Sequence, residues 1–489
     1  MNTKTTKIVA AIALLGVAYT GASWWLGKRV EERYAGLMER AIAMVGKDVI
    51  VERHYERGIF SSKSTMVLQL DWPKDPVKSK GADDQDDEDD ADGSDPSAAM
   101  QRMRITLQDD IRHGPIPGFH VGAALIQTRL VKVDGVDDAT RQMFAKVSPP
   151  VFDTVAGFGG TYSGQARLPA GELTDPESPR STFQWQELAY DYRYDTETHL
   201  MSGSARWPQL TMRVGPEAAA QSSADGVDTV IVRMDGLKAD FDVSQLNKRW
   251  YFLPGQQSGT IDALSVNYMA AGQSASKKVL GFKGLKFDSK MTSKDGLMDS
   301  VGHLTGAGHI GELELKEVSA ESALHRVSEE ALEAFQKVMD QMKASDAQGK
   351  PGEVAPEAIE ALVDALLKPK PEYRFSMKAT SADNQTAQLG YGVTIDDAHN
   401  APANEPWARR VQQRLHADAN VRVPKGWLPK LAGLGNGPKS KPETLAALAG
   451  TLVREGILVE EGDAYVAKAT YGDNQLSLNG KPLFGGKSR

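Results

Sequence analysis

A stretch of 19 residues without a charged side chain, from Ile8 to Leu26, constrains this chain most strongly. As an α-helix with a rise of about 1.5 Å per residue, it is roughly 28 Å long, close to the ~30 Å hydrocarbon core of a bilayer. Trp24 and Trp25 close it, where amphipathic rings favour the membrane interface. We therefore expect a transmembrane helix after a short cytoplasmic tail, both within residues 1–27. Its anchor residues are Ile8, Leu14, Leu15, Trp24, Trp25 and Leu26.

A cleaved signal peptide is the alternative for this segment. Its apolar region would run from Ile8 to Ala18, with Thr20 and Ala22 at the −3 and −1 positions before the cleavage site. The two tryptophans extend the apolar run to spanning length, and a charged helix follows without a break, which favours a retained anchor. Ala18 and Ala22 also form a small-xxx-small pair that could pack against a second span.

The remainder of the chain is dominated by strand patterns. A stalk helix is predicted over 28–48, and short strand patterns separated by turns recur through 49–318, the predicted periplasmic region. Within that region, residues 73–100 are acidic and flanked by prolines, so we expect a disordered insertion in a hairpin. A helical segment over 319–370 and a region of mixed helices and strands over 371–489 complete the predicted organisation.

The fold class predicted from these patterns is α+β, mainly β. It combines the N-terminal transmembrane helix with a large antiparallel meander sheet, either curved or folded into a sandwich, and with a few packing helices and an α+β C-terminal region. Apolar periodicity predicts helices over 30–45, 137–147, 320–343, from 356 onward, and over 406–417, 427–434 and 442–455.

Two segments 48 residues apart resemble each other, Met234–Asp242 and Phe282–Lys290. Both contain a glycine that is followed by leucine and lysine. Each is predicted to form a turn that leads into a half-buried strand, so the pair indicates a recurring hairpin unit.

Charge and cysteine content exclude several classes of function. Of the 65 acidic residues, nine lie between Asp83 and Asp95, and the other 56 stand against 57 lysines and arginines. The rest of the chain is therefore nearly neutral, and we expect no nucleic acid partner. Because the chain has no cysteine, disulfides, thiolate zinc sites and cysteine nucleophiles are excluded.

The motifs typical of catalysis or cofactor binding are absent or lack their required context. Gly306, Gly308 and Gly311 satisfy the G-x-G-x-x-G spacing, but the residues after them alternate like a strand, which favours a hairpin turn over a dinucleotide site. The nine histidines are dispersed, and no zinc-protease or P-loop motif occurs. We therefore predict no enzyme activity, no cofactor, and no catalytic, cofactor-binding or metal-binding residues.

His113, Gly114 and Pro115 are the remaining candidates for an exposed functional turn. Glycine and proline interrupt the hydrogen bonds of a strand, so the alternative is that this tripeptide simply ends a strand. Both interpretations place the three residues at the boundary between a strand and a loop.

Short motifs near both ends of the chain resemble the YdgA-like family of Gram-negative bacterial proteins. They are, in chain order, Gly21–Glu31, Tyr55–Ser62, His113–Pro115, Leu452–Leu458, Tyr465 and Tyr471–Lys481. The resemblance covers nearly the full length, although the acidic insertion at 83–95 departs from it. It implies a member of a family of uncharacterised proteins that are anchored in the bacterial inner membrane by a single pass, with their bulk in the periplasm. It carries over no catalytic residues.

Three functions are compatible with these features. The first is a non-enzymatic envelope role, in which lipid or fatty acyl chains bind a groove where helices cover only part of an apolar sheet face. The second is a homodimeric scaffold, assembled through the span and the stalk helix, that binds another envelope protein. The third is a hydrolase with an unrecognised site, which would need a deep polar pocket with convergent titratable groups.

Overall fold

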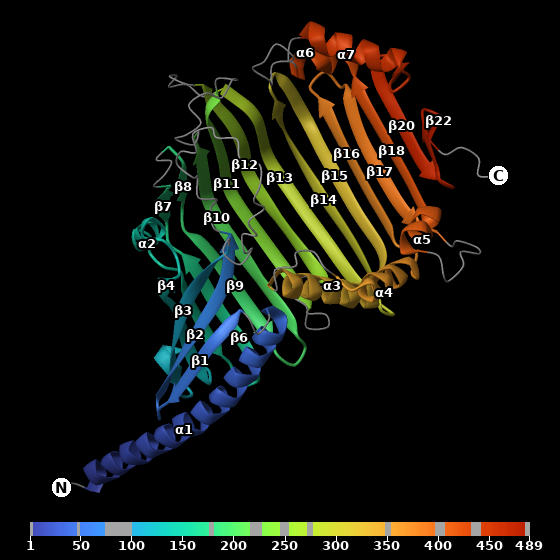
Figure 1. The fold of residues 1–489 in the computed structure, drawn as a ribbon. Helices are drawn as coiled ribbons and strands as arrows, with labels where there is room; N and C mark the ends of the chain where they lie inside the picture. Colours follow the sequence, from blue (N-terminus) through green and yellow to red (C-terminus); the bar gives the residue numbers. More distant parts are fainter. Residues whose placement is uncertain are drawn as a thin grey trace, which may run out of the picture. The chain divides into compact units, whose positions relative to one another are not determined.

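The computed structural model describes residues 3–45, 49–73, 100–175, 180–215, 227–244, 254–270, 277–347, 354–396, 406–431 and 442–484 (Figure 1). The chain divides into two compact units. Unit 1 comprises Met1–Pro176, Gln186–Arg206 and Phe241–Leu253. Unit 2 comprises Glu177–Trp185, Trp207–Asp240 and Pro254–Arg489.

Unit 1 consists of a long helix packed on an antiparallel sheet. Its strands pair in the order β1–β2–β3–β4–β5–β6–β9, and β9 pairs with the first part of β10. The strands are β1 (Ile50–Arg57), β2 (Ser61–Pro73), β3 (Met100–His113), β4 (Ala124–Asp134), β5 (Val151–Ala156), β6 (Thr161–Leu168), β7 (Gly171–Thr174), β9 (Leu188–Asp195) and β10 (Leu200–Val214). The helices are α1 (Thr3–Val45), the 3₁₀ turn η2 (Pro117–Phe119) and α2 (Asp138–Ala145).

The strand register places three of the connections in unit 1 at the same end of the sheet, where neighbouring strands begin or end. Ser61 pairs with Arg112, His113 pairs with Ala124, and Ala124 pairs with Ala156. The loops next to these residues therefore lie at the same ends of their strands. The three loops, which we call the turn edge, are 58–60, 114–123 and 157–160.

The second half of α1 packs on this sheet. Leu26, Val30 and Tyr34 recur at helical spacing, are each buried, and join Ile111 and Ala124 in the core of unit 1. Full burial of an aliphatic side chain contributes about 1.5–3 kcal/mol, so this stripe fixes the helix to the sheet. The helix predicted over 30–45 is confirmed, but its apolar stripe contacts the sheet and does not form a free stalk.

The predicted transmembrane helix can be compared with the structure only in part. α1 follows a helical path from Thr3, but the side chains up to residue 17 lie outside the described ones. These include Ile8, Leu14 and Leu15. Among the residues that are described, no helix combines the length and the apolar character needed to cross a membrane. Leu26 was predicted as an anchor residue, but it lies in the protein core because it shares a helix face with Val30.

Unit 2 is dominated by one antiparallel meander. From β12 onward each strand pairs with the next one up to β18, and β18 pairs with β20. The strands are β8 (Thr182–Trp185), β11 (Val227–Ser244), β12 (Gly255–Ala270), β13 (Lys277–Lys294), β14 (Leu297–Ile310), β15 (Leu313–Ser328), β16 (Glu372–Ser381), β17 (Thr386–Ile395), β18 (Leu415–Pro424), β19 (Val459–Glu461), β20 (Ala464–Gly472), β21 (Gln475–Leu478) and β22 (Lys481–Phe484). The helices are α3 (Glu329–Ala347), α4 (Pro356–Leu367), α5 (Trp407–Arg414), η3 (Lys425–Trp427), α6 (Leu428–Leu431) and α7 (Pro442–Arg454). The described residues thus confirm a mainly β chain with a large antiparallel sheet and a few helices.

The helix predicted over 320–343 begins later than expected. β15 continues to Ser328, and α3 starts only at Glu329. At this junction the Ser328 hydroxyl oxygen accepts the backbone N–H of Ala331 at 3.0 Å, as an N-cap residue does. The preceding residues pair with β14 and β16 instead of forming a helix, because strand pairing outweighs their intrinsic preference.

Of the other predicted helices, some are confirmed and one ends earlier than predicted. The helices predicted over 137–147, from 356 and over 442–455 are confirmed as α2, α4 and α7. In contrast, the last residues of the helix predicted over 406–417 belong to β18, which starts at Leu415 and pairs with β17.

The two similar segments are not turns, so that prediction is wrong. Gly236 lies within β11 and Gly284 within β13, with left-handed φ values of +68° and +58°. Between Lys283 and Lys286 the register of β13 against β14 shifts, which marks a β-bulge at Gly284. The similarity therefore reflects a glycine that bends a long strand and not a hairpin unit.

Two predicted hairpins are confirmed by their flanking strands. Gly306 and Gly308 lie in β14, and Gly311 forms the turn to β15 with φ +57°, so this glycine motif is not a dinucleotide loop. Pro73 of β2 pairs with Met100 of β3, as expected for an insertion between the arms of a hairpin. The predicted disorder of that insertion falls on residues 74–99, outside the described residues.

Candidate functional site

The sheet of unit 2 has an apolar side and a polar side. Successive side chains of a strand point to opposite faces, so Tyr373, Phe375 and Met377 of β16 share one face. Arg374 and Lys378 share the other face and are exposed. The same alternation continues on the neighbouring strands.

The strand register extends the apolar side across five strands. Leu304 of β14 pairs with Ala320, Ala320 with Met377, Met377 with Leu389, and Leu389 with Val421. Two parallel rows lie beside this one. They are Gly302–Ser322–Phe375–Tyr391–Ala419 and Ser300–Leu324–Tyr373–Val393–Ala417. We call these three rows the apolar face, and none of its residues is charged.

Helices cover the two ends of the apolar face but not its middle. At one end Trp427 of η3 packs on Val318 and Ala379, and at the other end Val327 is buried where α3 and α4 contact β15 (Figure 1). Between these ends, no residue of the three rows is buried. Leu304, Met377 and Tyr391 are 38%, 37% and 39% exposed.

Aromatic rings form the centre of the apolar face. The ring centroid of Tyr391 lies 5.2 Å from that of Phe375 and 5.7 Å from that of Tyr373. The hydroxyl groups of Ser322 and Tyr373 lie 3.3 Å apart. The face therefore combines an uncharged surface with a few hydroxyl groups that can orient a bound molecule.

A second feature lies in unit 1, where three of the sequence motifs quoted above for the resemblance meet around α1. A Cβ atom at Gly27 would lie 2.5 Å from Nδ1 of His113, and one at Gly114 would lie 2.9 Å from the hydroxyl oxygens of Ser23 and Tyr19. Glycine is thus required on both sides of this contact, where the helix approaches the end of β3 closely.

His113, Gly114 and Pro115 do not form an exposed functional turn. β3 ends at His113, as the alternative interpretation predicted. The side chain of His113 is only 2% exposed, and its burial lowers the pKa of the imidazole below its ordinary value. The tripeptide supports α1 and does not face the solvent as a reactive group.

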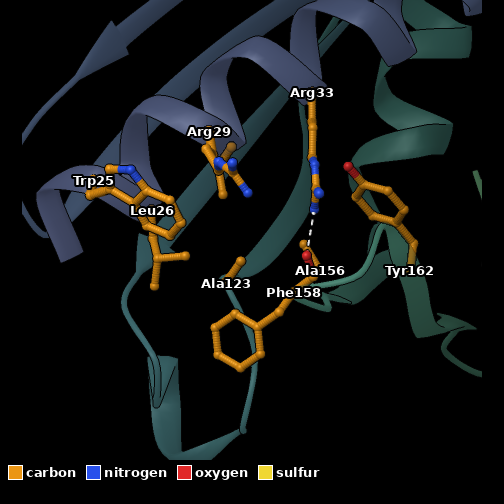
Figure 2. A pocket seen from close by; sticks show the side chains of 9 residues that line it. Trp25, Leu26, Arg29, Arg33, Ala123, Ala156, Phe158 and Tyr162 are labelled. Carbon is orange, nitrogen blue, oxygen red and sulfur yellow. Dashed lines mark hydrogen bonds between the residues drawn. The ribbon is translucent and has the colours of Figure 1, made fainter. Parts of the chain in front are cut away.

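A small cavity lies between α1 and the turn edge (Figure 2). Its volume is about 90 Å³, and its helix side is formed by Trp25, Leu26, Arg29, Val30 and Arg33. Arg33 donates a hydrogen bond to the carbonyl oxygen of Phe158 at 3.1 Å, and the guanidinium carbon of Arg29 lies 4.5 Å from the ring centroid of Trp25. The cavity is too small for an organic cofactor, but it brings two guanidinium groups to the surface of the helix.

The described residues contain no group of three or more histidine, aspartate or glutamate side chains that could hold a metal ion. Sequence reasoning identified the alternation of β16 and anticipated a partly covered apolar sheet face. It could not assign the residues of that face, because the registers that align five strands are long-range. It also did not identify Arg29 and Arg33, whose spacing on the helix was the available signal.

Comparison with known proteins gives one match. A family model described as "Bacterial protein of unknown function (DUF945)" matches residues 2–484. The chain belongs to this family. Neither the curated proteins nor the solved structures contain a match to it. The DUF945 match extends over nearly the full length, as the sequence resemblance does, and its description names no activity, ligand or location.

Proposed function

We propose that this DUF945 protein is a non-enzymatic component of the bacterial envelope that holds lipid acyl chains on the apolar face of unit 2. The observation that carries the proposal is that this face lies open between two helix-covered ends (Figure 1). A hydrocarbon chain laid on it gains about 0.8 kcal/mol for each CH₂ group removed from water.

The shape and chemistry of the apolar face support an acyl chain as its occupant. A row across five strands is roughly 19 Å long at a strand spacing of about 4.8 Å, which suits an extended chain. Leu304, Met377 and Leu389 along this row have flexible side chains that adapt to ligands of differing shape. The hydroxyl groups of Tyr373 and Tyr391 can accept or donate hydrogen bonds to an ester or a headgroup.

The proposed location rests on the sequence. The charge-free run from Ile8 to Leu26 and the resemblance to the YdgA-like family support a single-pass anchor in the inner membrane, with the bulk of the chain in the periplasm. The anchor would end at Trp24 and Trp25, because Leu26 packs in the core of unit 1.

The test is native mass spectrometry of the full-length chain purified from membranes in a mild detergent. The wild-type protein should carry lipid adducts. Leu389→Glu places a charge on the apolar face and should remove them. Gln388→Glu is the matched control, because it adds the same charge one residue away on the exposed polar side, and it should retain the lipid.

Three outcomes would overturn the proposal. They are a wild-type chain without lipid, a Leu389→Glu variant that retains it, and equal loss in both variants. A lipid-free dimer that Leu389→Glu dissociates would show that the apolar face is a dimer interface and would also overturn the proposal. Circular dichroism of both variants distinguishes loss of binding from loss of folding.

A further inference from the structure

The turn edge of unit 1 exposes large apolar side chains. On the loop between β3 and β4, Ile116, Val121 and Phe119 are 54%, 77% and 100% exposed. Phe60 and Phe158, on the two neighbouring loops, are about half exposed as well. Three separate loops therefore present apolar tips at the same edge of one sheet, where a soluble surface would favour polar residues.

The backbone holds Phe119 in a strained conformation. Its φ is +67°, in the left-handed region that bulky residues rarely adopt, and Gly118 before it has φ +57°. A non-glycine residue in this region costs about 1–2 kcal/mol. A fully exposed side chain adds no packing energy that would offset this strain, which makes Phe119 a candidate for a contact outside the chain.

α1 adds more aromatic side chains to this edge. The ring of Tyr19 stacks on that of Phe60 with a centroid distance of 6.4 Å, and Trp25 lines the same cavity as Phe158 (Figure 2). Trp24 is half exposed one residue away. We call the loop residues Ile116, Phe119, Val121, Phe60 and Phe158, together with Tyr19, Trp24 and Trp25, the apolar rim.

Guanidinium groups lie directly behind the apolar rim. Arg29 stands over the ring of Trp25, and the guanidinium carbon of Arg57 lies 5.9 Å from the ring centroid of Trp24. Arg57 is also paired with Glu31, at 3.2 Å between nitrogen and oxygen. An apolar tip followed by tryptophan and arginine is the order of groups that matches the hydrocarbon, interface and phosphate levels of a bilayer.

We propose that the apolar rim inserts into the interface of an anionic bilayer, with Arg29 and Arg57 at the level of the lipid phosphates. Projecting apolar tips backed by arginines suit insertion into the interface of an anionic bilayer. The helical residues of the rim, Tyr19, Trp24 and Trp25, also lie within the charge-free run from Ile8 to Leu26. This contact is made by loops and α1 residues of unit 1, so it goes beyond the proposed binding of acyl chains, which concerns unit 2.

Because the chain has no cysteine, a single introduced cysteine can be labelled specifically with a thiol-reactive fluorophore. The full-length Phe119→Cys variant carries an environment-sensitive fluorophore and is reconstituted into vesicles of phosphatidylcholine with or without phosphatidylglycerol. We expect a blue shift and quenching by bromine-labelled lipids. Phe144→Cys is the matched control: Phe144 is also an exposed phenylalanine of unit 1, but it lies on α2, which joins the opposite ends of β4 and β5. The fluorophore on Phe144→Cys should show neither the blue shift nor the quenching.

The labelling results can contradict the proposed insertion in two ways. A Phe119 label that reports water in both vesicles, or equal signals from the two labels, overturns the insertion. Arg29→Gln should weaken the signal from phosphatidylglycerol vesicles about fivefold, because one basic residue near an anionic surface contributes about that factor. A signal that is independent of phosphatidylglycerol overturns the role of the arginines. Leu389→Glu should leave the Phe119 signal unchanged, which separates this test from that of acyl-chain binding.

Discussion

The hydroxyl group of Tyr34, in the second half of α1, donates a hydrogen bond to the buried carboxylate of Asp109 on β3. The second carboxylate oxygen of Asp109 accepts a hydrogen bond from the Thr128 hydroxyl at 2.5 Å, and the Tyr34 oxygen also lies 3.0 Å from that of Ser64. Burial, together with the charge of Asp109, raises the pKa of Tyr34 well above its usual range. This polar network lies inside the core that fixes α1 to the sheet.

Tyr34→Phe should lower the free energy of unfolding of the full-length chain by about 1–3 kcal/mol. The substitution keeps the ring but leaves a buried carboxylate with one hydrogen bond fewer. Urea unfolding followed by tryptophan fluorescence measures the change. Tyr194→Phe is the control, because the Tyr194 hydroxyl makes an exposed contact with His199, and it should change stability by less than about 0.5 kcal/mol. Equal effects would show that the network contributes nothing specific.

Because His113 is buried, the free energy of unfolding should decrease at low pH. Above its ordinary pKa of 6.5, the imidazole is neutral in both the folded and the unfolded chain, so it adds no pH dependence. As the pH falls below 6.5, the unfolded chain binds a proton that the folded chain excludes, because burial lowers the pKa of His113. Stability therefore falls with pH until the lower pKa of the folded state is reached.

Thermal unfolding at a series of pH values measures this effect. His113→Asn should flatten the decrease below pH 6.5, whereas His120→Asn, which removes an exposed histidine of the loop after β3, should leave it unchanged. An unchanged pH profile in His113→Asn would mean that another group causes the acid sensitivity.

Gly27→Ala should destabilise the packing of α1 on the sheet by about 1–3 kcal/mol. The added methyl group would lie 2.5 Å from Nδ1 of His113, so the helix or the imidazole must move. Gly36→Ala is the matched control on the same helix: nothing lies within 4 Å of its Cβ position, and alanine favours helix by up to about 1 kcal/mol. The two variants should therefore shift the unfolding midpoint in opposite directions, and shifts of the same sign would contradict the close contact.

Local features of the fold can be predicted from the sequence. The helical stripe with Val30 and Tyr34 and the alternation of Tyr373, Phe375 and Met377 depend on neighbours a few residues away. Helix starts with a clear cap, such as Asp137 before α2, are also identified, because the cap is a local hydrogen bond. From these signals the sequence predicts a mainly β chain with a few helices.

Features that depend on long-range pairing cannot be predicted in this way. Asp109 lies 75 residues from Tyr34, and no local pattern shows that the two meet. The continuation of β15 to Ser328 depends on partners in β14 and β16, which outweigh a helical pattern. The apolar face and the apolar rim require the register of five strands and three loops, so neither was predicted as a unit.

The bulge at Gly284 provides a test of the repeated glycine segment. Nothing lies within 4 Å of the Cβ position of Gly284, so Gly284→Ala introduces no clash, only a side chain at a left-handed φ of +58°. We expect a loss of about 1–2 kcal/mol in the free energy of unfolding from this strain. Gly302→Ala, on the neighbouring strand β14, is the control. Its nearest contact would be an ordinary 3.5 Å and its φ is not left-handed, so it should be neutral or slightly stabilising. Denaturant unfolding compares the two variants, and a neutral Gly284→Ala would mean that the strand straightens without cost and that the bulge does not depend on glycine.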